Sequence, residues 1–147
     1  MNLGVHARIA VVTGSTVGIG LAIATALAAE GASVVVNGRT QARVTAAIEQ
    51  IRRTVEGARV QGVAADLGAA SGADAFVREV PEADVLVNNL GIFEAKPFGE
   101  IPDADWMRFF EVNVLSGVRL ARRYVPGMTA RKWGRVIFIS SSRFPPT

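Results

Sequence analysis

The stretch that decides the fold is Thr13-Gly14-Ser15-Thr16-Val17-Gly18-Ile19-Gly20. It follows a short apolar run, residues 9–13, which is typical of a buried parallel strand. It leads into an Ala- and Leu-rich run, residues 18–30, which predicts a buried helix that ends at Gly31. Glycines in such a turn let the backbone bend sharply and let a pyrophosphate reach the helix N-terminus, where free N–H groups and the helix dipole favour an anion.

The turn is therefore a candidate nucleotide-binding loop, although its GxxxGxG spacing differs from the common GxGxxG motif. Glycines also serve in ordinary tight turns and in close packing. The pattern gains its meaning from its position between the first strand and the first helix of an alternating chain. The residues expected to contact a cofactor here are Gly14, Ser15, Thr16, Gly18, Ile19 and Gly20.

Outward from this turn, strand and helix patterns alternate along the chain. Strands are predicted at 9–13, 33–37, 60–64, 84–88 and 136–139. Helices are predicted at 18–30, at 41–55 with Thr40 as N-cap, at 69–79, and from Asp103 to Gly134. Alternation with short connections predicts an α/β fold, a Rossmann-type doubly wound parallel sheet of about five strands covered by helices on both faces. We expect one domain over residues 1–147.

The last predicted helix carries a long apolar stripe along which it should pack. Asp103 is expected to cap its start and Gly134 to end it. The stripe consists of Trp106, Phe109, Phe110, Val114, Gly117, Leu120, Ala121, Tyr124 and Met128. Asn113 falls on this stripe, where an amide costs stability unless it finds hydrogen-bond partners. We therefore expect Asn113 to make specific hydrogen bonds.

Composition excludes several function classes. The 147 residues are 50% hydrophobic and 20% charged, with a net charge of +3, which is typical of a globular protein and does not indicate nucleic-acid binding. Without cysteine, and with His6 as the one histidine, the chain forms neither a disulfide nor a thiolate or multi-histidine metal site. Residues 1–9 lack the apolar segment of a signal peptide, and no apolar run has the length of a membrane span. We expect a soluble cytoplasmic protein with no membrane partner.

The TGxxxGIG pattern at residues 13–20 resembles that of the short-chain dehydrogenase/reductase family, and the resemblance extends along almost the whole chain. The family's Asp after the third strand, near the adenine, is matched by Asp66. Its Asn-Asn-Ala-Gly motif after the fourth strand appears as Asn88-Asn89-Leu90-Gly91, with Leu90 as a departure. The resemblance assigns to cofactor binding Asp66, Leu67, Asn88 and Gly91, and to catalysis Asn113 and Ser141.

The resemblance also implies roles for the two catalytic candidates. Asn113 would hold a water in a proton relay, and Ser141, at the exit of the fifth strand, would orient the substrate oxygen. Other interpretations stay open for several positions. Asp66 could cap the turn after its strand, Asn88 and Asn89 could be turn residues, and Ser140-Ser141-Ser142 could be a polar strand end.

Cofactor preference depends on the residues after the second strand. An acidic residue there would bind the ribose 2′-hydroxyl, whereas an arginine would accommodate a 2′-phosphate. The family's acidic position holds Gly38, and Arg39 follows it. The sequence therefore predicts NADP(H), with NAD(H) as the alternative if Arg39 is only a solvated loop residue.

The resemblance implies an NAD(P)-dependent oxidoreductase that transfers a hydride between NADP(H) and a small carbonyl or alcohol substrate, acting as a homo-oligomer. The family's proton donor is the tyrosine of a Tyr-x-x-x-Lys pair, about a dozen residues after the serine, whose lysine lowers the tyrosine pKa. The chain ends at Thr147, before that point, and its one tyrosine, Tyr124, lies on the last helix. We therefore expect a truncated member that lacks this pair and the substrate lid. A catalytically inactive nucleotide-binding fragment or regulator is the alternative, and a relative that performs epimerisation or dehydration is a third.

Overall fold

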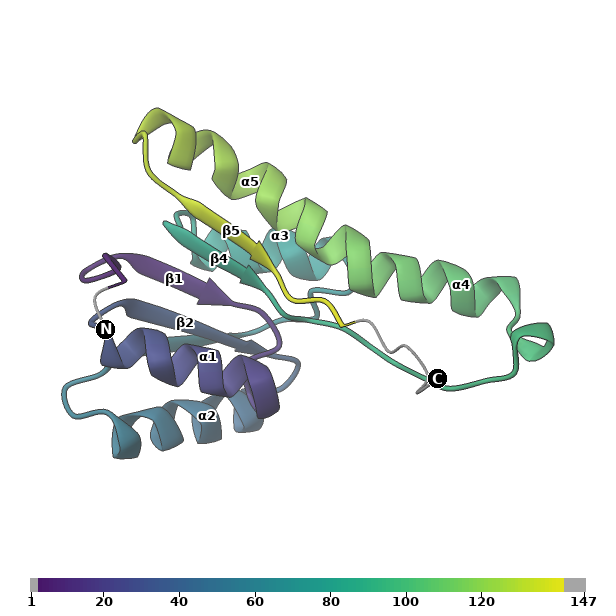
Figure 1. Cartoon of the computed structure of the whole chain (residues 1–147), viewed down its shortest axis with the longest axis horizontal. Helices are drawn as coiled ribbons and strands as arrows, with labels where there is room; N and C mark the ends of the chain where they lie inside the picture. Colours follow the sequence, from purple (N-terminus) through teal and green to yellow (C-terminus); the bar gives the residue numbers. More distant parts are fainter. Residues whose placement is uncertain (1–2, 142–147) are drawn as a thin grey trace, which may run out of the picture.

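The computed structural model describes residues 3–141 and shows a sheet flanked by helices (Figure 1). Its strands are β1 (Ile9–Val12), β2 (Ser33–Gly38), β3 (Arg59–Ala64), β4 (Val85–Asn88) and β5 (Arg135–Phe138). Its α-helices are α1 (Gly18–Ala29), α2 (Gln41–Thr54), α3 (Ala70–Glu79), α4 (Asp103–Phe110) and α5 (Ser116–Ala130). The remaining helical segments are a 3₁₀ turn, η1 (Phe98–Glu100), and a π-helical segment, η2 (Glu111–Leu115). The predicted order of strands and helices is confirmed.

The five strands are parallel and lie in the order β3-β2-β1-β4-β5. The chain therefore starts in the middle of the sheet, builds outward to β3, and crosses back to β4. In register, Val12 of β1 lies beside Val36 of β2 and Val87 of β4. The strand order reverses between β1 and β4, which is where open α/β sheets bind ligands at the carboxyl ends of their strands.

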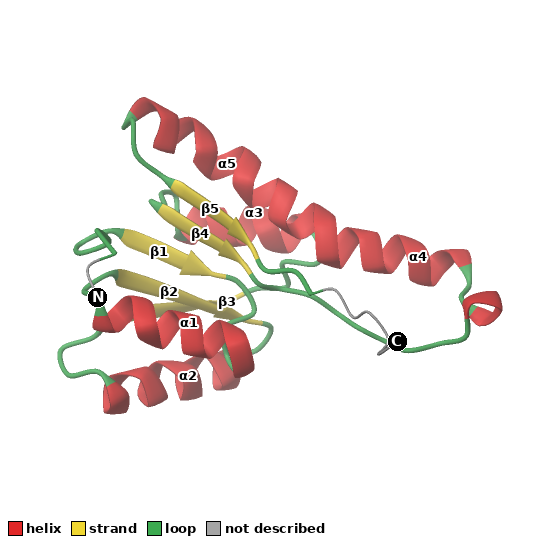
Figure 2. Cartoon of the chain, viewed as in Figure 1, coloured by secondary structure: helices red, strands yellow, loops and turns green. Residues whose placement is uncertain are grey.

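Helices cover both faces of the sheet, and each face has its own core (Figure 2). On one face, α1 and α2 pack through buried side chains that include Ala24, Val44 and Ile51. On the other face, α3 and α5 pack through Phe76 and Leu120, which are fully buried. Strands that are covered on both faces have continuous apolar sequences, which is why they could be found in the sequence.

The sequence predicted the features of α2 better than those of α1. Thr40 caps α2 as predicted, because its side chain accepts a hydrogen bond from the Arg43 N–H at 3.4 Å. The prediction of a buried helix holds for only one side of α1, since Leu21 is buried while Ala22 and Ala26 are exposed. Alanine favours a helix through its backbone propensity, and its small methyl group tolerates water, so an Ala-rich pattern does not require burial on every side.

The last predicted helix consists of three segments, α4, η2 and α5. It begins at Asp103, but Asp103 does not cap it, because Pro102 holds the N-cap position and no side-chain cap forms. It ends at Ala130 and not at Gly134. The reason is that Lys132 takes a positive φ of 55°, which turns the chain out of the helix two residues earlier than its glycine.

The apolar stripe of this helix is buried over only part of its length. The stripe residues buried in α5 are Gly117, Leu120, Tyr124 and Met128. In α4 and η2 no residue is buried, and Trp106, Phe110 and Val114 are 53%, 51% and 42% exposed. The difference arises because α5 lies along the sheet, whereas α4 projects beyond the carboxyl ends of the strands (Figure 1). We call residues 92–115, which comprise the loop after β4, η1, α4 and η2, the arm.

β5 forms one edge of the sheet within the part of the chain that the structure describes. Its last residue, Phe138, is 54% exposed, and Ile137 beside it is 45% exposed. An apolar strand at a sheet edge presents free backbone groups together with apolar side chains, so it is a ready template for pairing with further chain.

Candidate functional site

The predicted cofactor residues meet at the carboxyl ends of the strands. The turn 13–18 follows β1, and residues 88–91 end and follow β4. Arg39 follows β2 and Asp66 follows β3. Because β1 lies between β2 and β4, its turn has Arg39 toward one side and residues 88–91 toward the other. Ser141 follows β5 at the same edge of the sheet.

Thr13 joins the glycine-rich turn to the end of β4. Its hydroxyl oxygen accepts hydrogen bonds from the N–H groups of Asn89 and Leu90 at 3.0 and 2.9 Å. The side-chain amide of Asn89 donates in return to the carbonyl oxygens of Thr13 and Gly14, at 3.2 and 3.0 Å. These four bonds fix the two loops against each other.

Ser15 and Asn37 hold the same turn from the side of β2. The Ser15 hydroxyl donates to the Val12 carbonyl at 2.6 Å and accepts from the Asn37 N–H at 2.9 Å, and the Ser15 N–H donates to the Asn37 carbonyl. The Asn37 side chain accepts from the Gly14 N–H at 3.3 Å and donates to two carbonyl groups at the end of β3. Ser15, which the sequence suggested as a cofactor contact, is fully buried and has no free donor, so its role is to shape the turn.

The glycines of the turn serve different purposes. Gly20 is required by packing, because an added Cβ would lie 2.5 Å from the Gly14 carbonyl oxygen. Gly18 has a φ of 58°, and an added Cβ there would meet nothing within 4 Å. Its neighbours Val17 and Ile19 are 70% and 65% exposed. Gly18 therefore borders open space at the N-terminus of α1, which has neither a side-chain cap nor an acidic residue in its first turn.

Gly38 and Arg39 determine the space and the charge that a ligand would contact beyond the end of β2. An added Cβ at Gly38 would lie 2.5 Å from the Thr16 methyl carbon, so Thr16 occupies the space that a side chain at position 38 needs. An acidic side chain cannot be placed there unless Thr16 moves. Arg39 is exposed, and its guanidinium makes no hydrogen bond or ion pair within residues 3–141. This edge of the site thus carries an unpaired positive charge.

The residues after β3 are used largely by the protein itself. The Asp66 carboxylate accepts a hydrogen bond from the Gly68 N–H at 3.0 Å, which is the turn-capping role left open by the sequence. Asp66 is nevertheless exposed at the site edge. Leu67 is 1% exposed and lies in the core between the sheet and α3 and α5. The Leu67 side chain therefore cannot touch a ligand, which leaves only its backbone for the predicted contact.

Asn88 differs from its neighbour Asn89. It is buried, and both polar atoms of its side chain lack a hydrogen-bond partner among the described residues. Its backbone carbonyl accepts from the Ile139 N–H at 2.9 Å and so ties β4 to the residue that follows β5. Gly117 of α5 closes over the Asn88 side chain, since an added Cβ would lie 3.1 Å from its Cγ. The amide is thus held in place by packing.

Asn113 lies in η2 and holds the first residue of the arm. Its Oδ1 accepts from the Ile92 N–H at 2.7 Å, and its Nδ2 donates to the Ile92 carbonyl at 3.0 Å. An added Cβ at Gly91 would lie 3.2 Å from Asn113 Oδ1, so the glycine permits this close approach. Asn113 is exposed and not buried as the stripe suggested, because η2 belongs to the projecting arm. π-helical turns of this kind often occur at functional sites.

Ser141 and Tyr124, the remaining hydroxyl groups of interest, differ in their exposure to solvent. Ser141 is exposed beyond the end of β5. Tyr124 is buried in α5, donates a hydrogen bond to the Val80 carbonyl at 2.7 Å, and has its pKa raised above the ordinary value of 10.0 by that burial. A phenol with this environment does not exchange protons with a substrate near neutral pH.

Residues 3–141 were also searched for metal and membrane features. No group of three or more His, Cys, Asp or Glu side chains is placed to hold a metal ion within these residues. None of their helices combines the length and the apolar character needed to cross a membrane.

Comparison with known proteins identifies the family. The profile of the short chain dehydrogenases matches residues 8–143. This chain belongs to that family. The structure agrees, since L-sorbose reductase from Gluconobacter frateurii, solved with NADPH and L-sorbose, superposes with a TM-score of 0.88 at 41% identity, over 94% of this chain and 54% of that one.

Two sequence relatives show how much of the family's length is present. The uncharacterized oxidoreductase YvaG of Bacillus subtilis is 50% identical over 141 residues, which are 96% of this chain and 53% of the relative. D-beta-hydroxybutyrate dehydrogenase of Cupriavidus necator is 38% identical over 141 residues, which are 93% of this chain and 54% of the relative. The chain thus spans about half the length of these relatives.

The residues predicted to contact the cofactor or substrate did not include three that organise the site, namely Thr13, Asn37 and Asn89. Each is a polar residue at the carboxyl end of an apolar strand, where its side chain bonds to the neighbouring loop. A polar residue that ends a buried strand needs hydrogen-bond partners, and that requirement was the available signal. Their hydrogen-bond partners lie more than 20 residues away in the chain, and Thr13 and Asn89 are 76 residues apart. Local sequence patterns therefore could not predict these pairs.

Proposed function

We propose that this chain binds NADP(H) at the carboxyl ends of β1, β2 and β4, as the nucleotide-binding part of an oxidoreductase that acts on a small carbonyl or alcohol. The observation that carries the proposal is the open space in front of Gly18, at the uncapped N-terminus of α1. A helix N-terminus with free N–H groups and no acidic neighbour attracts an anionic group, and the absence of a side chain at Gly18 allows a pyrophosphate to approach the backbone.

The residues around the turn fit the remaining parts of this cofactor. The unpaired guanidinium of Arg39 suits a 2′-phosphate, to which it can donate charge-assisted hydrogen bonds. The exposed Asp66 would lie near the adenine, and Asn88 and Gly91 lie on the other side of the glycine-rich turn. When bound, NADPH would donate a hydride to a carbonyl, and NADP⁺ would accept one from an alcohol. Asn113 would hold Ile92 and the arm in place beside it, and Ser141 would orient the substrate oxygen.

A second candidate function is nucleotide binding without turnover. Tyr124 is the one tyrosine in the sequence, and its burial and raised pKa remove it from proton transfer. A nucleotide-protected chain that fails to oxidise NADPH with acetophenone or dihydroxyacetone would favour this second function. Assembly as a homo-oligomer and a cytoplasmic location stay predictions.

Cofactor preference can be tested by thermal shift with NADPH and NADH at equal concentrations. A ligand that binds only the folded state stabilises it in proportion to the logarithm of its concentration over Kd. We expect the larger shift with NADPH. Arg39→Ala should weaken NADPH binding by about 1–3 kcal/mol and leave NADH unchanged, because a charge-assisted bond is lost. Arg53→Ala, on the exposed far end of α2, is the matched control. Equal shifts for both nucleotides would contradict the assignment.

The pyrophosphate position can be tested at Gly18. Gly18→Val places a side chain in the open space at the helix N-terminus and should abolish protection by NADPH. Gly57→Val is the matched control, since Gly57 also has a positive φ and open space around it but lies in the turn between α2 and β3. Both variants carry the same backbone strain, so only a specific loss at Gly18 supports the proposal. Retained NADPH protection in Gly18→Val would show that the turn is merely structural.

A further inference from the structure

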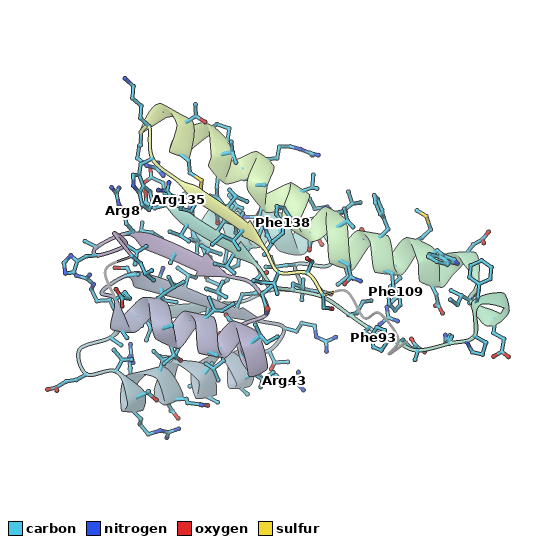
Figure 3. All side chains as sticks on the ribbon, in the orientation of Figure 1. Arg8, Arg43, Phe93, Phe109, Arg135 and Phe138 are labelled. Atoms are coloured by element: carbon cyan, nitrogen blue, oxygen red, sulfur yellow. The ribbon has the colours of Figure 1, made fainter. Side chains whose placement is uncertain are left out.

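The arm forms an apolar cavity that is partly open to solvent, since Phe93 in its lining is 80% exposed. The cavity has a volume of about 280 Å³ and lies between the loop after β4 and α4. Its apolar lining comes from Phe93 and Ile101 of the loop and from Trp106 and Phe109 of α4. Figure 3 labels Phe93 on the loop and Phe109 on α4, which border the space between these two segments.

Through Phe93, the cavity lies one residue from the segment that Asn113 holds. Phe93 directly follows Ile92, whose N–H and carbonyl are both bonded to the Asn113 amide. Phe109 precedes Asn113 by four residues on the helix, so the two side chains lie about one turn apart on the same side. The cavity lining therefore lies close to Asn113.

The charged side chains at the cavity form ion pairs with each other, so they do not provide a binding site for a charged ligand. Lys96 Nζ lies 2.6 Å from an Asp105 carboxylate oxygen and 3.1 Å from one of Glu94. Glu94 is also 3.8 Å from Arg108. These pairs hold the loop against α4, and an edge-to-face contact of Phe98 with Trp106, with ring centroids 6.4 Å apart, adds to them. What remains for a ligand is the aromatic and aliphatic surface.

We infer that this cavity receives the apolar portion of the substrate, and that the substrate class is an uncharged ketone or alcohol with a phenyl-sized apolar group. The inference rests on the proposed function, since it assumes that the substrate whose oxygen Ser141 orients also reaches the segment held by Asn113. Volume supports the size, because an apolar cavity of about 150 Å³ already binds benzene in another protein. An apolar lining without free polar groups disfavours a polyhydroxylated substrate, whose hydroxyl groups would be left unpaired.

The two tryptophans provide a direct test on the whole chain. Trp106 lines the cavity, whereas Trp133 has the guanidinium carbons of Arg8 and Arg135 over its ring at 4.1 and 4.9 Å. Figure 3 shows these two arginines at the opposite end of the molecule from Phe93 and Phe109. Proton–nitrogen correlation spectra give one indole N–H signal for each, assigned with Trp106→Phe and Trp133→Phe. Titration with acetophenone should shift the Trp106 signal in a saturable way and leave the Trp133 signal in place. Dihydroxyacetone, a polar ketone, should shift neither.

Matched variants define the cavity. Phe109→Glu should weaken acetophenone binding by roughly tenfold or more, because it places a charge in an apolar site. Phe110→Glu, one residue later and outside the lining, should change it by no more than about twofold. Phe93→Glu provides a second lining variant that cannot disturb folding through burial, since Phe93 is 80% exposed.

Three results would overturn the inference. They are a shift that does not saturate, equal effects of Phe109→Glu and Phe110→Glu, and movement of the Trp106 signal on dilution without ketone, which would mean that a second copy fills the cavity. NADPH protection is measured on the same samples. If it persists while acetophenone has no specific effect, only the cavity inference fails. If NADPH protection is also absent, the proposed function itself fails.

Discussion

The sheet with its packed helices and the arm differ in how their side chains are used. In the sheet body, Phe76, Leu86 and Leu120 are fully buried between the strands and the covering helices. In the arm, η1, α4 and η2 bury no residue at all, although their sequences are rich in aromatic side chains. Burial in the body stabilises the fold, whereas the arm is held by local ion pairs, one aromatic contact and the Asn113 bonds. Apolar residues in these two regions therefore serve different purposes.

We expect the largest difference between the sheet body and the arm when one phenylalanine in each is replaced by alanine and the loss of unfolding free energy is compared. Phe76→Ala should lower the free energy of unfolding by about 3–5 kcal/mol, because it leaves a cavity in the core under α3. Phe110→Ala should lower it by less than about 0.5 kcal/mol, since its side chain is half exposed on α4. Urea unfolding of the two variants measures both values. A comparable loss in Phe110→Ala would mean that the arm is packed against something that stabilises it.

A smaller effect is expected where α5 joins the body, at Tyr124. Tyr124→Phe removes the hydrogen bond to the Val80 carbonyl, leaves that buried carbonyl unpaired, and should cost about 1–3 kcal/mol of unfolding free energy. The raised pKa predicts a pH dependence as well. The folded chain keeps the phenol protonated, so this stabilisation is fully present below the unfolded pKa, about 10, and is lost as the pH rises above it.

The check for this pH dependence is spectroscopic. Because the sequence has a single tyrosine, tyrosinate absorbance in the near ultraviolet reports on Tyr124 alone. It should appear together with alkaline unfolding, and Tyr124→Phe should remove it. Tyrosinate that forms while the chain stays folded would show that the phenol is accessible.

The smallest effect is expected at the ion pairs of the arm. Lys96→Met should leave the urea midpoint unchanged, because exposed ion pairs contribute little to global stability. It should increase amide hydrogen exchange in the loop 93–101, which these pairs hold against α4. The bonds to Asp105 and then Glu94 raise the Lys96 pKa, so the pairing persists below the ordinary lysine value of 10.5 and is lost only as the pH rises through the raised one. A shift in the global midpoint would contradict the local role given to the arm.

Much of the fold could be predicted from the sequence, and less of the site. Strands β1 and β4 are apolar runs between turn residues, and Thr40 before an amphipathic pattern correctly predicted a cap. Gly18 and Arg39 both follow strand ends, which parallel topology brings to one edge, whereas their contact with a cofactor stays a prediction. Ser15 and Leu67 were expected at the cofactor and prove to be buried in the turn and the core. Spacing places a residue near a site but does not say which way its side chain points.

The sequence by itself determined the alternation of strands and helices, the glycine-rich turn at the start of α1 and the family, because each depends on local pattern and order. Only the tertiary structure decided which polar groups are free. Arg39 has no partner among residues 3–141, while Asn37 and Asn89 are bound to loops from distant parts of the chain. It also decided that one half of a continuous apolar stripe is buried in α5 and the other half exposed in the arm. The physical reason is that the sequence pattern determines which face of a helix is apolar. Whether that face is buried depends on whether the sheet lies beside it.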